Sequence, residues 1–138
     1  MTDMEWRSIN AFAARLTGTG YLGWFNLPIW QIRSALEYPE IAGPPMDCRL
    51  WVACEWIICS GRVIYKELEV SSDQALDEEM AKVAELGPLC KAKSPLSLER
   101  WSYWEARLLE LSDHLCETLS RGTQDHVARA IHSMANIK

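Results

Sequence analysis

The segment from residue 47 to residue 68 constrains the fold most, because its apolar side chains cover almost the whole circumference of a helix. Apolar residues fill positions 50–54 and 56–59, and only Glu55 interrupts them. A helix that is apolar on nearly all sides has to be surrounded by other elements of the fold. We therefore predict that residues 47–68 form a buried central helix.

Five other segments show helical periodicity, at about residues 2–16, 26–37, 71–86, 97–120 and 123–134. Thr2 and Glu5 have the spacing of a capping box at the start of the first segment. Its apolar residues recur at helical spacing, namely Trp6, Ile9, Ala13 and Leu16, with Phe12 beside them. No segment alternates in the manner of a strand bounded by hairpin turns. The pattern predicts an all-α fold, a single domain over 1–138 built as a compact bundle of about six helices around the 47–68 helix.

Seven tryptophans in 138 residues indicate how the core is built, since each can bury a large apolar area. Six of them form three closely spaced pairs: Trp24 with Trp30, Trp51 with Trp56, and Trp101 with Trp104. The second pair lies in the predicted central helix. The third lies on the apolar face of the 97–120 helix, so we expect these two helices to pack together.

Composition excludes several classes of protein. The net charge is −5 and the 14 lysines and arginines are scattered, which argues against nucleic-acid binding. The longest apolar run, residues 50–59, is about half as long as a membrane-spanning helix. Neither the three histidines nor the five cysteines have the spacing of metal ligands, and no nucleotide-binding motif occurs, so we predict no metal and no cofactor. We expect a soluble, cytoplasmic protein that does not enter membranes.

Glu55 is the one residue that breaks the local pattern, because it interrupts the apolar run of the central helix. A buried carboxyl group either meets a cation or stays protonated at a large free-energy cost. One interpretation is an internal ion pair or hydrogen bond with Arg33, Arg62 or Arg100. The other is a catalytic acid or base that faces an apolar pocket.

Two hypotheses of function follow from these residues. The first is a cofactor-independent small-molecule protein, either a ligand-binding protein or an isomerase- or cyclase-type enzyme, with a tryptophan-lined pocket next to Glu55. Its candidate ligand-binding residues are Trp51, Trp56, Arg100, Trp101, Tyr103 and Trp104. The alternative is a protein-interaction module without catalysis, a homodimer or an adaptor, that uses exposed apolar surface at Trp6, Trp24 or Phe25. The sequence leaves open whether the protein is an enzyme.

Four segments resemble a family of fungal proteins known as a helical domain of unknown function. They are FAARLTGTG at 12–20, IWQIRSALE at 29–37, LWVACEWIICSGRVIYKE at 50–67 and SLERWSYWEARL at 97–108. The R-W-x-x-W step at Arg100, Trp101 and Trp104 carries the resemblance best. The resemblance implies a fungal, intracellular, all-helical protein, and it brings no catalytic residues with it.

Overall fold

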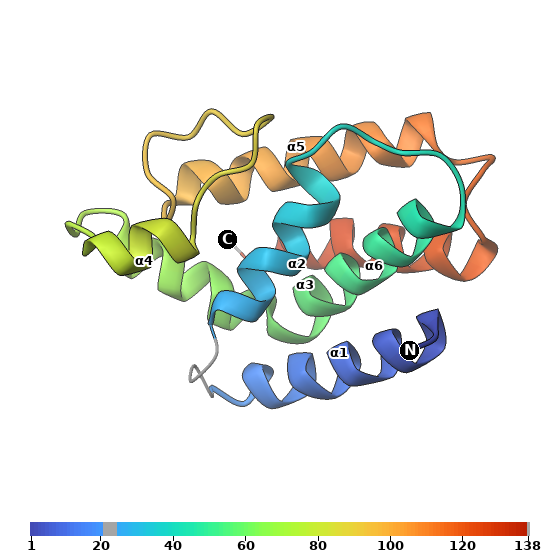
Figure 1. The fold of residues 1–138 in the computed structure, drawn as a ribbon, viewed down its shortest axis with the longest axis horizontal. Coiled ribbons are helices and arrows are strands. Elements are labelled where there is room, and N and C mark those ends of the chain that lie inside the picture. The colour runs from blue at the N-terminus through green and yellow to red at the C-terminus, as the bar shows by residue number, and fades with distance from the viewer. Residues whose placement is uncertain (21–24, 138) are drawn as a thin grey trace.

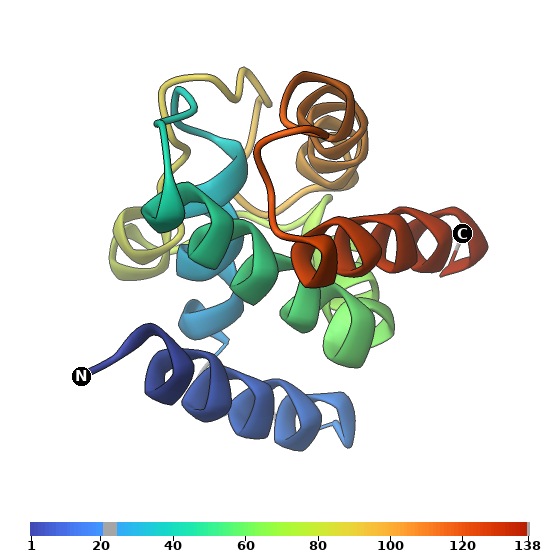
Figure 2. The same ribbon diagram turned by 90° about the vertical axis from the view of Figure 1, so that its right-hand side faces the viewer.

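The computed structural model describes residues 1–20 and 25–137, and within these ranges the secondary structure is entirely helical (Figure 1). The helices are α1 (Asp3–Gly18), α2 (Asn26–Leu36), α3 (Pro44–Ser71), α4 (Glu78–Val83), α5 (Leu98–His114) and α6 (Arg121–Ile137). In both views α1 forms one outer edge of the bundle and α5 lies toward the opposite edge, with α3 and α6 between them (Figure 2). The predicted all-α bundle is confirmed.

Helix α3 is the central element, as the sequence predicts, and it packs against α1, α2, α5 and α6. It begins at Pro44, three residues earlier than predicted. A proline fits the first turn of a helix, because the backbone N–H groups there have no acceptor within the helix and the N–H that proline lacks is not needed. Its residues Leu50, Trp56 and Ile57 are fully buried. No described helix is both long enough and apolar enough to cross a bilayer.

Helix α1 turns its small residues inward and its large apolar residues outward. The buried residues are Asn10, Ala11, Ala13, Ala14 and Thr17. The reason is a close approach to α3: the Ser60 hydroxyl donates to the Ala14 carbonyl at 2.6 Å, and a Cβ at Gly18 would overlap the Cys59 carbonyl oxygen. Larger side chains do not fit into this contact. The apolar stripe seen in the sequence therefore lies mostly on the solvent side of α1.

The predicted helices over 71–86 and 97–120 are both shorter in the structure. Ser71 is the last residue of α3, and Asp77 caps α4 instead by accepting from Met80 N at 2.7 Å. Helix α5 ends at His114, after which the chain turns and α6 starts at Arg121. An extended connection runs from α4 to α5, and α2 holds it in place.

Candidate functional site

Glu55 is 9% exposed, and its partner is His126 of α6 rather than one of the three arginines considered from the sequence. His126 Nε2 lies 2.9 Å from Glu55 Oε1. This hydrogen bond lowers the pKa of Glu55 below its ordinary value, although burial acts in the opposite direction. The positive charges of Arg15 and Arg129 lower it further. Glu55 is therefore an ionised carboxylate at neutral pH.

The imidazole of His126 stacks on Trp51, with ring centroids 4.6 Å apart and an angle of 2° between the ring planes. The Arg7 guanidinium of α1 lies 5.3 Å from the centre of the same indole. Trp51 itself is partly buried. Through these contacts four side chains, those of Arg7, Trp51, His126 and Glu55, form a continuous line that joins α1, α3 and α6. Protein side chains therefore occupy the space next to Glu55.

Asp47 of α3 connects Arg7, the first residue of this line, to residues at the start of α6. It accepts from Ser120 N at 2.6 Å and from the Thr123 hydroxyl at 2.5 Å, and it pairs with Arg7 at 3.1 Å. Burial raises the pKa of Asp47, but the hydrogen bonds from Thr123 and Ser120 and the charge of Arg7 outweigh it and leave the pKa lowered. Asp47 therefore ties α3 to Ser120, the residue before α6, and the Ser120 hydroxyl in turn accepts from Thr123 N at 3.3 Å as a cap does.

Arg100 forms a buried ion pair with Glu37, and both side chains are fully shielded from solvent. Glu37 accepts from Arg100 Nε at 2.7 Å and Nη2 at 2.9 Å, from Trp104 Nε1 at 2.7 Å and from Gly87 N at 2.8 Å. Arg100 and Trp104 come from one face of α5, four residues apart, so the R-W-x-x-W step supplies three of these four donors. Sequence reasoning missed Glu37, which carries no signal beyond its place at the end of the second predicted helix.

The remaining donors of Arg100 go to the backbone of the α4–α5 connection. Nη1 donates to the Ala84 carbonyl at 2.6 Å and to the Pro95 carbonyl at 2.7 Å, and Nη2 donates to the Glu85 carbonyl at 3.3 Å. Together with Glu37 these acceptors take all five N–H groups of the guanidinium. No donor of Arg100 is left for a ligand, so in this structure it holds the connection to α2 and α5.

The other predicted ligand-binding residues mostly fill the core. Trp56 is fully buried, and its Nε1 donates to Asn10 Oδ1 at 2.9 Å. Trp101 and Trp104 are at most 1% exposed, with ring centroids 6.2 Å apart. The partly buried Tyr103 donates its hydroxyl to the Leu36 carbonyl at 3.2 Å, and burial raises its pKa. Trp56, Trp101 and Trp104 therefore lie together in the core around α3 and α5.

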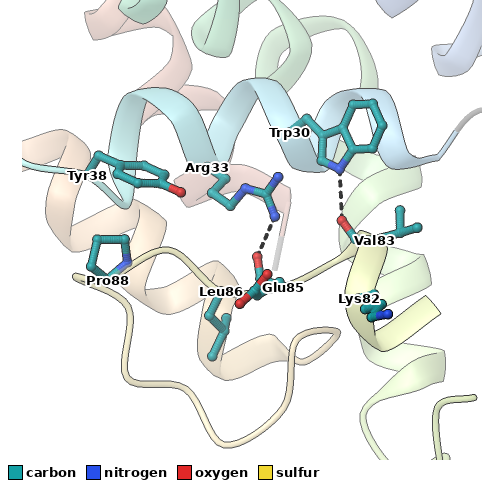
Figure 3. A pocket seen from close by; sticks show the side chains of 8 residues that line it. All are labelled: Trp30, Arg33, Tyr38, Lys82, Val83, Glu85, Leu86 and Pro88. Atoms are coloured by element: carbon teal, nitrogen blue, oxygen red, sulfur yellow. Dashed lines mark hydrogen bonds between the residues drawn. The ribbon is translucent and has the colours of Figure 1, made fainter. Parts of the chain in front are cut away.

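Two adjoining hollows lie at the surface beside α2. One of about 510 Å³ runs between α2 and residues 82–88 (Figure 3). It is spanned by two hydrogen bonds, from Trp30 Nε1 to the Val83 carbonyl at 2.8 Å and from Arg33 Nη1 to the Glu85 carbonyl at 2.6 Å. A second hollow of about 430 Å³ adjoins it at Trp30. We call the first of these the α2 groove.

Four of the five most exposed large apolar side chains of the described residues lie on α1 or just before its start. Met1 is 82% exposed, Met4 77%, Phe12 62% and Ile9 50%. We call these four residues the α1 stripe, and Trp6, at 38% exposed, lies at its edge. Trp24 falls outside the described residues, and Phe25 is partly buried against the core. Of the two suggested interface residues that the structure describes, Trp6 is exposed and Phe25 is not.

No group of three or more described histidine, cysteine or acidic residues is arranged to hold a metal ion. Comparison with curated proteins gave no match, and comparison with solved structures gave none either. A family model described as "Protein of unknown function (DUF3632)" matches residues 1–108. The matched region contains Glu37, Glu55, Arg100 and the α1 stripe, whereas α6 with His126 lies beyond it. The chain thus belongs to this DUF3632 family of unknown function.

Proposed function

We propose that this protein is a protein-interaction module that pairs with a second copy of itself through the α1 stripe. The observation that carries the proposal is the inverted arrangement of α1, whose large apolar side chains face solvent while small ones face α3. An exposed apolar patch on one helix is typical of a surface that another protein covers. The fungal origin and the cytoplasmic location remain predictions from the sequence.

A second copy fits the stripe because the pattern along α1 is self-complementary. Glu5, Ile9 and Phe12 follow one another at spacings of four and three residues, which places them on one side of the helix. Arg15 is exposed at the far end. If two copies of α1 lie antiparallel about an axis near residue 10, Ile9 of each meets Phe12 of the other, and Glu5 of each comes near Arg15 of the other. A twofold dimer requires this kind of pairing.

The small-molecule hypothesis finds less support in the same residues. Glu55 is engaged by His126, and Arg100 donates every N–H to the protein. The tryptophans predicted to line a pocket beside Glu55 are largely buried against one another and against α3. These contacts favour the interaction module over a catalytic pocket at this position.

The stripe spans about three helical turns, a smaller surface than the roughly 1,600 Å² of a standard interface. We therefore expect a weak dimer, with a dissociation constant of about 10 to 100 µM. Sedimentation velocity over about 5 to 500 µM measures this range directly. Phe12→Glu should keep the protein monomeric throughout, because a charge would be buried in the contact.

The matched control is Leu109→Glu, which places the same charge at a 53% exposed leucine on α5, away from the stripe. This variant should dimerise like the wild type. A charge exchange tests the register: Glu5→Lys and Arg15→Glu should each dimerise more weakly alone, and their mixture should form the mixed dimer, which restores both pairs. Because Glu5 also accepts from Thr2 N, the thermal unfolding of that variant is measured in parallel.

A monomeric wild type at the highest concentration would refute the proposal. So would a Phe12→Glu variant that dimerises as strongly as the wild type. A dimer disrupted by Leu109→Glu but not by Phe12→Glu would place the interface on α5 instead.

A further inference from the structure

We propose that the α2 groove binds a small aromatic carboxylate. The groove is separate from the α1 stripe, and the residues that carry the argument are Trp30, Arg33, Tyr38, Lys82, Glu85 and Pro88. Its volume of about 510 Å³ lies within the range of small-molecule sites. The hydrogen bonds from Trp30 and Arg33 to the opposite wall fix its shape without a ligand.

The polar groups that face the groove are mainly donors. Arg33 uses Nη1 for the Glu85 carbonyl, and its Nε and Nη2 groups donate to no other described residue. The hydroxyl of Tyr38 has no hydrogen bond within the described part of the chain. Figure 3 shows the Tyr38 hydroxyl directed along the α2 side of the groove toward Arg33, with Pro88 below the phenol ring in this view. A carboxylate between them could accept from both residues, and a planar guanidinium suits a carboxylate well.

The charge of the groove also favours an anion. Arg33 and Lys82 contribute two positive charges and Glu85 one negative charge, so the lining carries a net charge of +1. The whole chain carries −5. A positively charged hollow on an acidic protein attracts small anions that the rest of the surface repels.

Two aromatic side chains of the groove suggest that the ligand also carries a flat ring. Trp30 is 39% exposed and Tyr38 is 42% exposed, so both offer ring surface to the groove. Trp30 lies within α2, and Tyr38 follows Leu36, the last residue of this helix, by two positions. Arg33 lies between them. A flat ring that packs on either aromatic side chain can thus place a carboxylate attached to it near the guanidinium.

The test is isothermal titration calorimetry with 2-naphthoate, and 2-naphthamide serves as the neutral probe of the same shape. We expect saturable binding of the acid and at least about tenfold weaker binding of the amide, because the charged hydrogen bonds to Arg33 are lost. Arg33→Gln should weaken naphthoate binding to the same extent. Arg62→Gln, which removes an exposed arginine of α3 outside the groove, should leave it unchanged.

Arg33 also holds the Glu85 carbonyl, so the fold of its variant is checked by circular dichroism. Tyr38→Phe provides a second variant that removes only a hydroxyl with no partner among the described residues, and binding should fall by about fivefold. In two-dimensional NMR, the indole N–H signal assigned to Trp30 through Trp30→Phe should shift on titration. Equal binding of acid and amide, an unaffected Tyr38→Phe, or no saturation up to about 10 mM naphthoate would overturn the proposal.

Discussion

Replacing Glu37 by glutamine removes a negative charge from a place where its partner has no access to water. Arg100 and Glu37 are both 0% exposed, and the carboxylate of Glu37 accepts four hydrogen bonds. Glutamine has almost the same shape, so the substitution leaves the packing intact. It does, however, turn one acceptor oxygen into an NH2 group that faces donors only.

The expected loss in the free energy of unfolding is about 3 to 5 kcal/mol, because removing one partner leaves the other charge buried and unpaired. A loss of this size is a large part of the roughly 5 to 15 kcal/mol that a domain usually has. Glu37 also binds Gly87 N, and a Cβ at Gly87 would lie 2.6 Å from the Glu37 Cβ, so the connection cannot shift freely to compensate.

Urea unfolding followed by tryptophan fluorescence measures the loss. The control is Glu110→Gln, since the Glu110 side chain is 54% exposed, although its partner Arg107 is only 8% exposed. Its loss should stay below about 1 kcal/mol. If Glu37→Gln were also to lose less than about 1 kcal/mol, the view that Glu37 and Arg100 hold the α4–α5 connection would be refuted.

The remaining predictions concern pH and the start of α6. The pKa of Glu55 is lowered by its hydrogen bond with His126, so its ionised form stabilises the fold above the ordinary value of 4.5, and this contribution disappears as the pH falls through the lower folded pKa. Urea midpoints from about pH 6 to pH 3 should therefore fall more steeply for the wild type than for Glu55→Gln, and parallel slopes would contradict this. Asp47→Ala should lower stability by about 1 to 2 kcal/mol and speed hydrogen exchange near Ser120 and Thr123. Asp47→Asn, which keeps an acceptor oxygen for Ser120 and Thr123, should lose less, and an equal loss would show that the charge rather than these hydrogen bonds matters.

The central helix could be predicted because its signal is local. Apolar residues around its whole circumference leave burial on all sides as the only favourable outcome, and the burial of Leu50 and Trp56 confirms it. The all-α class follows from the same periodicity in the other segments. The ends of the helices were less predictable, since Ser71 has the pattern of a cap but lies in the last turn of α3.

The partners of the buried charges could not be predicted, because they depend on how the helices cross. Glu37 and Arg100 are 63 residues apart, and Glu55 and His126 are 71 residues apart. Periodicity places each residue on a face of its own helix, and it does not show which residue of another helix meets it. The orientation of α1 was hidden for the same reason. Its close approach to α3 at Gly18 favours alanines over larger apolar side chains on the inner face.

The tight contact between α1 and α3 also determines which surface of α1 is available to a partner. The Ser60 hydroxyl donates to the Ala14 carbonyl, and the two backbones approach so closely that a Cβ at Gly18 would overlap the Cys59 carbonyl oxygen. These contacts set which side of α1 faces solvent before any encounter. Association would then require no reorientation of α1, and the entropy lost would be that of bringing two bodies together and of ordering the exposed side chains. A small surface can form a specific contact under this condition.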